Sequence, residues 1–97
     1  MVWLMYEARP TQESDYYREC GGAYINCWVL TVNANEAESR SRSDILHSGW
    51  EIIELCEGPR SVERSRYVDD EEALASYDAA LTDGAAYDYY TWPKDEQ

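Results

Sequence analysis

The clearest pattern of apolar and polar positions lies in residues 23–57. Over 23–32, apolar side chains occupy both alternating faces and β-favouring types are frequent, which predicts a central strand with two apolar sides. Asn33 or Asn35, each followed three residues later by a glutamate, provides the cap at which a helix begins. Gly49 ends that helix, because glycine adopts the left-handed conformation of a helix C-terminus, and a second two-sided apolar strand follows.

Weaker patterns on either side of this stretch predict further elements. The acidic residues from Asp69 onward, with Glu72 three positions later, favour the start of a second helix because carboxylates stabilise a helix N-terminus. The other elements are a strand over 2–8, a polar connection over 9–22, a turn at Gly58-Pro59, a charged edge strand over 61–68 and a last strand over 85–92.

Residues 23–92 therefore follow the order β-α-β-β-α-β. This order resembles the ferredoxin-like split βαβ sandwich, which implies an α+β fold with an antiparallel sheet and two helices on one face, here with an extra N-terminal strand. We expect a single α+β domain over 1–97, with an N-terminal strand and long loop in 1–22 and a tail in 93–97. The fold hosts many unrelated activities, so it transfers no function.

The strands are apolar on both sides, although a sheet with both helices on one face leaves the other face to solvent. We therefore expect a second copy to cover the helix-free face in a twofold homodimer. The residues expected on this dimer face are Trp3, Met5, Trp28 and Trp50.

The chain is acidic, with 8 Lys and Arg against 20 Asp and Glu and a formal net charge of -12. Such a charge repels nucleic acid and anionic membranes and speeds encounter with a basic protein. We therefore expect no direct nucleic-acid binding and no membrane association. The start of the chain resembles no signal peptide, which favours a cytoplasmic location.

Cys20, Cys27 and Cys56 are odd in number and irregularly spaced, which is atypical of a disulfide framework. Without a Cys-x-x-Cys pair they predict no metal site, and cysteine inside an apolar strand packs as a small hydrophobe. No cofactor motif occurs in the chain, so none is expected.

His47 is the only histidine, and with Asp44 nearby it is the one candidate for a proton shuttle. A cation near a helix C-terminus is stabilising by roughly 0.3–1 kcal/mol, so His47 is explained without catalysis. We expect no catalytic residue.

Aromatic residues and carboxylates alternate near the C-terminus, and two tyrosines lie in the polar loop. Tyrosine and tryptophan supply contact area while carboxylates attract a basic surface, a combination typical of interaction patches. The candidate partner-binding residues are Tyr16, Tyr17, Tyr87, Tyr89, Tyr90 and Trp92.

Three classes of function remain. The favoured one is a non-enzymatic acidic interaction or regulatory module acting as a homodimer. A small enzyme or ligand-binding protein, with an aromatic-lined cleft in a dimeric α+β barrel, is the first alternative. An acidic inhibitor that mimics nucleic acid is the second.

Overall fold

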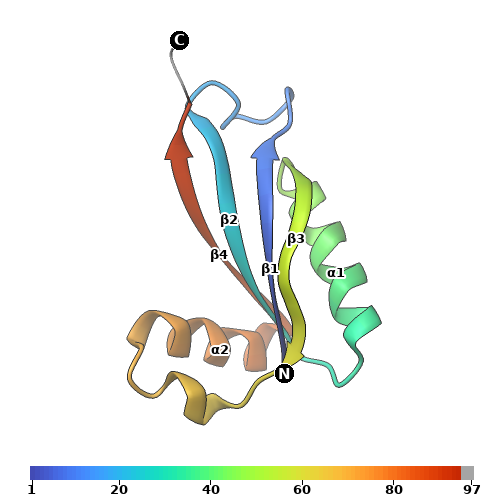
Figure 1. Ribbon diagram of the computed structural model, residues 1–97, viewed down its shortest axis with the longest axis vertical. Helices are drawn as coiled ribbons and strands as arrows, with labels where there is room; N and C mark the ends of the chain where they lie inside the picture. Colours follow the sequence, from blue (N-terminus) through green and yellow to red (C-terminus); the bar gives the residue numbers. More distant parts are fainter. Residues whose placement is uncertain (95–97) are drawn as a thin grey trace.

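The computed structural model describes residues 1–94 and shows an α+β fold, a four-stranded antiparallel sheet with two helices (Figure 1). The strands lie in the order β3-β1-β2-β4, and every neighbouring pair is antiparallel. In chain order the elements are β1 (Val2–Pro10), β2 (Cys20–Val29), α1 (Ala34–His47), β3 (Trp50–Ser61), a 3-10 helix η1 (Arg64–Tyr67), α2 (Glu71–Asp83) and β4 (Ala85–Pro93).

Both helices start at the predicted cap or one residue from it. The side chain of Asn33 accepts hydrogen bonds from the amides of Asn35 and Glu36, which satisfies two donors at the start of α1. Asp70, one residue later than expected, caps α2 by accepting from the amide of Ala73. Gly84 ends α2 with a φ of 91°, a left-handed conformation that side chains disfavour.

The predicted edge strand over 61–68 is wrong. β3 continues through Gly58-Pro59, where the turn was expected, as far as Ser61, and the chain then forms η1. Two apolar residues of this segment, Val62 and Tyr67, are buried in one cluster with α2, and a strand that alternates sides could not direct both inward. The third, Val68, is 58% exposed. The sheet therefore has four strands, and the order of elements is β-β-α-β-α-β.

α1 covers one face of the sheet. Even-numbered side chains of β1, among them Leu4 and Tyr6, pack with Ile25 from β2 and with Ala37 and Ile45 from α1, and all of these are fully buried. This cluster is the larger of the two cores, and it holds the length of α1 against the sheet.

α2 packs on the opposite face, so the prediction that both helices share one face is wrong. Trp28 alternates with the residues of the first core and packs with Tyr77 and Ala80 of α2 and with Tyr67. The reason is the two-sided apolar character of β2, because the tryptophan on its second side requires cover of its own. α2 crosses only the end of the sheet near the N-terminus, as Figure 1 shows, and leaves the rest of this face open.

Candidate functional site

The open face is the part of the sheet opposite α1 that lies beyond α2. Strand alternation and register bring its side chains together: Met5 pairs with Asn26, Asn26 with Asp88, and Tyr24 with Tyr90. The open face comprises Met5, Glu7, Tyr24, Asn26, Glu54, Cys56, Asp88, Tyr90 and Trp92. It combines aromatic side chains with carboxylates. Arg9 and Arg60 lie on the same side of the sheet, at its two ends, and are paired with Glu51 and Glu57.

The aromatic residues of the open face pack on one another but stay accessible. The rings of Tyr24 and Trp92 lie 5.1 Å apart between centroids, and Tyr24 and Tyr90 are 44% and 48% exposed. Gly22 provides the space for Trp92, because a Cβ on this glycine would lie 2.4 Å from Cζ2 of the indole. These rings present a preformed apolar surface next to the acidic groups.

Glu7 and Glu54 are directly opposed on neighbouring strands. Two like charges in this position destabilise a sheet, and neither carboxylate forms an ion pair within residues 1–94. The arrangement therefore leaves two carboxylates without an ion pair on the side of the open face formed by β1 and β3.

Carboxylates also surround Tyr90 at the end of the open face near α2. Burial first, and then the charges of Asp88, Glu72 and Asp70, raise the pKa of the Tyr90 hydroxyl above its usual value. Asp88 accepts a hydrogen bond of 2.6 Å from Ser76 of α2, which fixes this carboxylate in place. Negative charge thus extends from the strands onto the first turn of α2.

One group of side chains among the described residues has the spacing of metal ligands. The ligand atoms of Glu7, Glu54 and Cys56 lie within 4.8 Å of one another. Burial, and then the charges of Glu54 and Glu7, raise the pKa of the Cys56 thiol, which opposes formation of the thiolate that binds metals. The carboxylates are left as an anionic pair.

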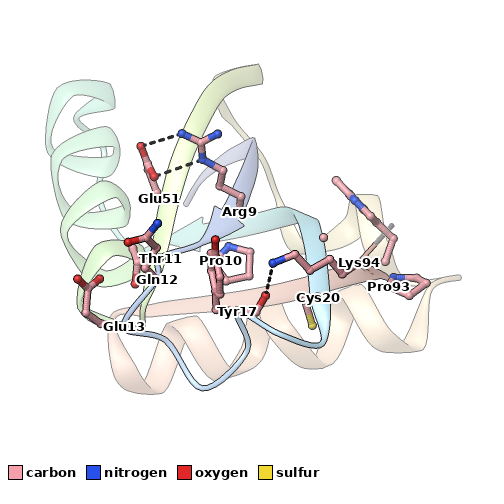
Figure 2. Close-up of a pocket in the computed structure, with 12 residues that line it drawn as sticks. Arg9, Pro10, Thr11, Gln12, Glu13, Tyr17, Cys20, Glu51, Pro93 and Lys94 are labelled. Carbon is pink, nitrogen blue, oxygen red and sulfur yellow. Dashed lines mark hydrogen bonds and ion pairs between the residues drawn. The ribbon is translucent and has the colours of Figure 1, made fainter. Parts of the chain in front are cut away.

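A polar pocket of about 800 Å³ lies beside the far end of the open face (Figure 2). Figure 2 shows Arg9 and Glu51 directed at each other, with guanidinium nitrogens 3.3 Å from both carboxylate oxygens. Lys94 donates from Nζ to the carbonyl of Tyr17 at 3.1 Å and lies 3.8 Å above the Tyr17 ring. Arg9 is paired with a carboxylate, whereas Lys94 is held by a carbonyl and a ring and keeps its positive charge in the pocket wall.

The structure separates the predicted partner-binding residues. Tyr16 and Tyr89 pack on Trp50 on the side of α1, with ring centroids 5.8 Å and 5.5 Å from it. Tyr87 donates to Asp44 of α1 at 2.5 Å, and burial followed by this bond raises the pKa of its hydroxyl. Tyr17 lies in the polar pocket. Of the predicted set, the open face receives Tyr90 and Trp92.

The four residues expected to form a dimer face do not share one surface. Trp28 and Trp50 are each 3% exposed and belong to the two different cores. Trp3 packs at the edge of the α2 cluster, with the guanidinium of Arg60 4.6 Å above its ring. Met5 alone of the four lies on the open face.

No hydrogen bond among the described residues joins His47 to Asp44. The Nδ1 of His47 lies 2.7 Å from the carbonyl of Ser43, and Asp44 is occupied by Tyr87 and by Arg40. His47 therefore contacts the last turn of α1, which agrees with a role in its C-terminus.

Sequence reasoning missed Glu7, Tyr24 and Glu54. Glu7 and Tyr24 alternate with buried residues in their strands, a signal that places them on the second side. Glu54 is brought opposite Glu7 only by the pairing of β1 with β3, and this pairing has no local signature.

Comparison with protein-family models, curated proteins and solved structures gives no match for this chain. Neither helix of the described residues has the length and apolar character needed to cross a bilayer.

Proposed function

We propose that this protein is a non-catalytic binding module whose open face captures a basic segment of a partner protein. The observation that carries the proposal is the opposed pair Glu7 and Glu54, neither of which forms an ion pair within the described residues. A sheet that keeps two like charges side by side loses stability, and a cationic ligand restores it.

The exposed rings suit the same ligand. Lysine and arginine side chains carry apolar stems and bind over aromatic faces, with roughly 0.5–1 kcal/mol for each exposed cation-π contact. Tyr24 and Tyr90 flank the acidic positions, so a basic segment contacts rings and carboxylates together. The formal charge of -12 accelerates its approach.

A second copy of the chain is a poorer occupant of the open face. Pairing two such faces would place the Glu7 and Glu54 carboxylates of one copy near those of the other, and like charges across an interface are unfavourable. Two of the four residues that motivated a homodimer, Trp28 and Trp50, are buried within the chain, while Trp3 and Met5 are half-buried. The proposal therefore retains the basic partner and not face-to-face homodimerisation.

The test measures binding of a fluorescent lysine-rich peptide to the Glu7→Gln/Glu54→Gln double variant. Exposed ion pairs contribute about 0.2–1 kcal/mol each, so loss of two should weaken binding by roughly 2- to 30-fold. The same variant should unfold at a higher temperature than the parent protein, because it removes the like-charge contact. Anisotropy titration and thermal unfolding measure the two effects.

The matched control is Asp15→Asn/Glu36→Gln. It also removes two negative charges, but on the side of α1. Asp15 precedes Tyr16, which stacks on Trp50, and Glu36 lies in the first turn of α1. If the control weakens binding as much as the open-face variant, only the overall charge attracts the peptide and the proposed site is wrong. Binding that is unaffected between low and physiological salt would also contradict the proposal.

A further inference from the structure

β4 is an edge strand with one side unpaired. It pairs with β2 along its length, and no described residue pairs with its other side. Figure 1 shows nothing beyond this edge along the upper part of β4, away from α2. An unpaired strand edge carries backbone donors and acceptors that another strand can use.

The hydrogen-bond pattern shows which residues of β4 point outward. The amide of Leu30 donates to the carbonyl of Gly84, and bonded pairs recur at every second residue of an antiparallel ladder. Even-numbered residues of β4 therefore bond to β2, while the amides and carbonyls of Tyr87, Tyr89 and Thr91 face outward. Pro93 occupies the next odd position, where its missing N–H costs no ladder bond.

The opposite edge of the sheet has more features that discourage strand addition than this one, in which Pro93 stands only at the end. β3 pairs with β1 through register shifts at three places and contains Pro59 and several charged residues, all of which discourage strand addition. β4 pairs with β2 without a shift from Ala23–Thr91 to Val29–Ala85, and Asp88 is the only charged residue in it. The regular edge is thus the one that carries Asp88 and Tyr90 of the open face.

We propose that a basic segment also binds as an added antiparallel strand on the free edge of β4, beside Asp88 and Tyr90. The strand order places Glu7 and Glu54 in the third and fourth strands from this edge, so the inference goes beyond the site of the proposed function. Antiparallel addition continues the pattern of the whole sheet and gives the better ladder geometry. A second copy fits less well, because two chains of charge -12 repel each other.

The geometry also sets the spacing of charges in the ligand. Residues of the added strand that bond to Tyr87, Tyr89 and Thr91 direct their side chains to the side of α1, because directly opposed residues share a face. The residues between them project over the open face, next to Asp88 and Tyr90. A strand with lysine at every second position therefore brings each lysine to the acidic side.

The probe is a short acetylated peptide of alternating lysine and valine, prepared in two N-methylated forms. Methylation of the valine amides removes the donors that face β4, whereas methylation of the lysine amides affects only the outer edge. The two forms have the same composition and charge. We expect the valine-methylated form to bind about tenfold more weakly or worse, since each hydrogen bond lost contributes about 1 kcal/mol.

A protein variant provides a second test. Thr91→Pro removes one outward donor at an exposed position and leaves the bonds to β2 intact, so circular dichroism should be unchanged while the unmethylated peptide binds several-fold more weakly. Because the methylated peptides need no change in the protein, they decide the question even if this variant does not fold.

The outcomes separate the two proposals. Both methylated forms are also compared on the Glu7→Gln/Glu54→Gln variant, in which the edge of β4 is unchanged. Equal affinity of the two forms there, or the reverse order, overturns the added strand and leaves the proposed function untouched. Failure of the unmethylated peptide to bind overturns both.

Discussion

The buried contact between Tyr6 and Ser41 anchors α1 to the sheet, and its removal should destabilise the fold. Both residues are 0% exposed, and their hydroxyl oxygens lie 2.6 Å apart. Ser41 donates to the carbonyl of Glu38 at 3.1 Å, so Tyr6 is the donor to Ser41. In Ser41→Ala the Tyr6 hydroxyl retains only a weak contact of 3.5 Å with Glu38.

The magnitude follows from the burial of these groups. Leaving a buried hydroxyl unsatisfied costs about 1–3 kcal/mol, whereas Tyr6→Phe removes the donor itself and should cost about 0.5–1.5 kcal/mol. The double variant leaves no unsatisfied hydroxyl on Tyr6, so it should be less destabilised than the sum of the single variants by about 1 kcal/mol. Each kcal/mol corresponds to roughly 4–8 °C in Tm for a domain of this size.

Urea unfolding of the four proteins gives this coupling directly. The midpoints should shift while the m-values remain constant, because the surface exposed on unfolding is the same. Additivity of the two single effects within about 0.3 kcal/mol would refute the reasoning, since it would mean that the hydroxyls do not interact.

Two further changes test other contacts. Gly22→Ala should destabilise the protein by about 1–3 kcal/mol and alter tryptophan fluorescence, because its Cβ would lie 2.4 Å from the Trp92 ring and 2.9 Å from the carbonyl of Ala8; an unchanged emission spectrum would contradict this. The hydrogen bond and charge of Arg64 lower the pKa of Asp78, so the stability contributed by this carboxylate is present above its unfolded pKa and is lost as the pH falls through the lowered folded value. Asp78→Asn should therefore reduce the loss of stability on acidification, as measured by urea midpoints at neutral and acidic pH, and an identical pH dependence in both proteins would argue against the pair.

Much of the candidate site depends on contacts that no local pattern specifies. Tyr90 and Trp92 were predicted as binding residues, because alternating aromatic and acidic residues are recognisable within a short segment. Tyr87 and Tyr89 were grouped with them, but alternation along β4 sends those two to the side of α1. Alternation with a period of two assigns the side chains of a strand to the two faces of the sheet. It does not show which face a helix covers.

The local elements were determined by the sequence itself. Asn33 and Gly84 act through the backbone groups of their own helices. The apolar residues on both sides of β2 predict a buried strand, whatever packs against it. These features involve neighbours along the chain, so their physical causes are present in any window of a few residues.

The tertiary structure alone decided the position of α2, the conformation of residues 61–68 and the pairing that places Glu7 opposite Glu54. Each of these depends on surfaces that come together only after the chain has folded back on itself. α2 lies over Trp28 because an indole on the second side of the sheet needs cover, and this placement leaves the rest of the face open. Burial and charge act across space without regard to sequence separation, and for that reason the acidic open face appears in the folded chain and not in its linear pattern.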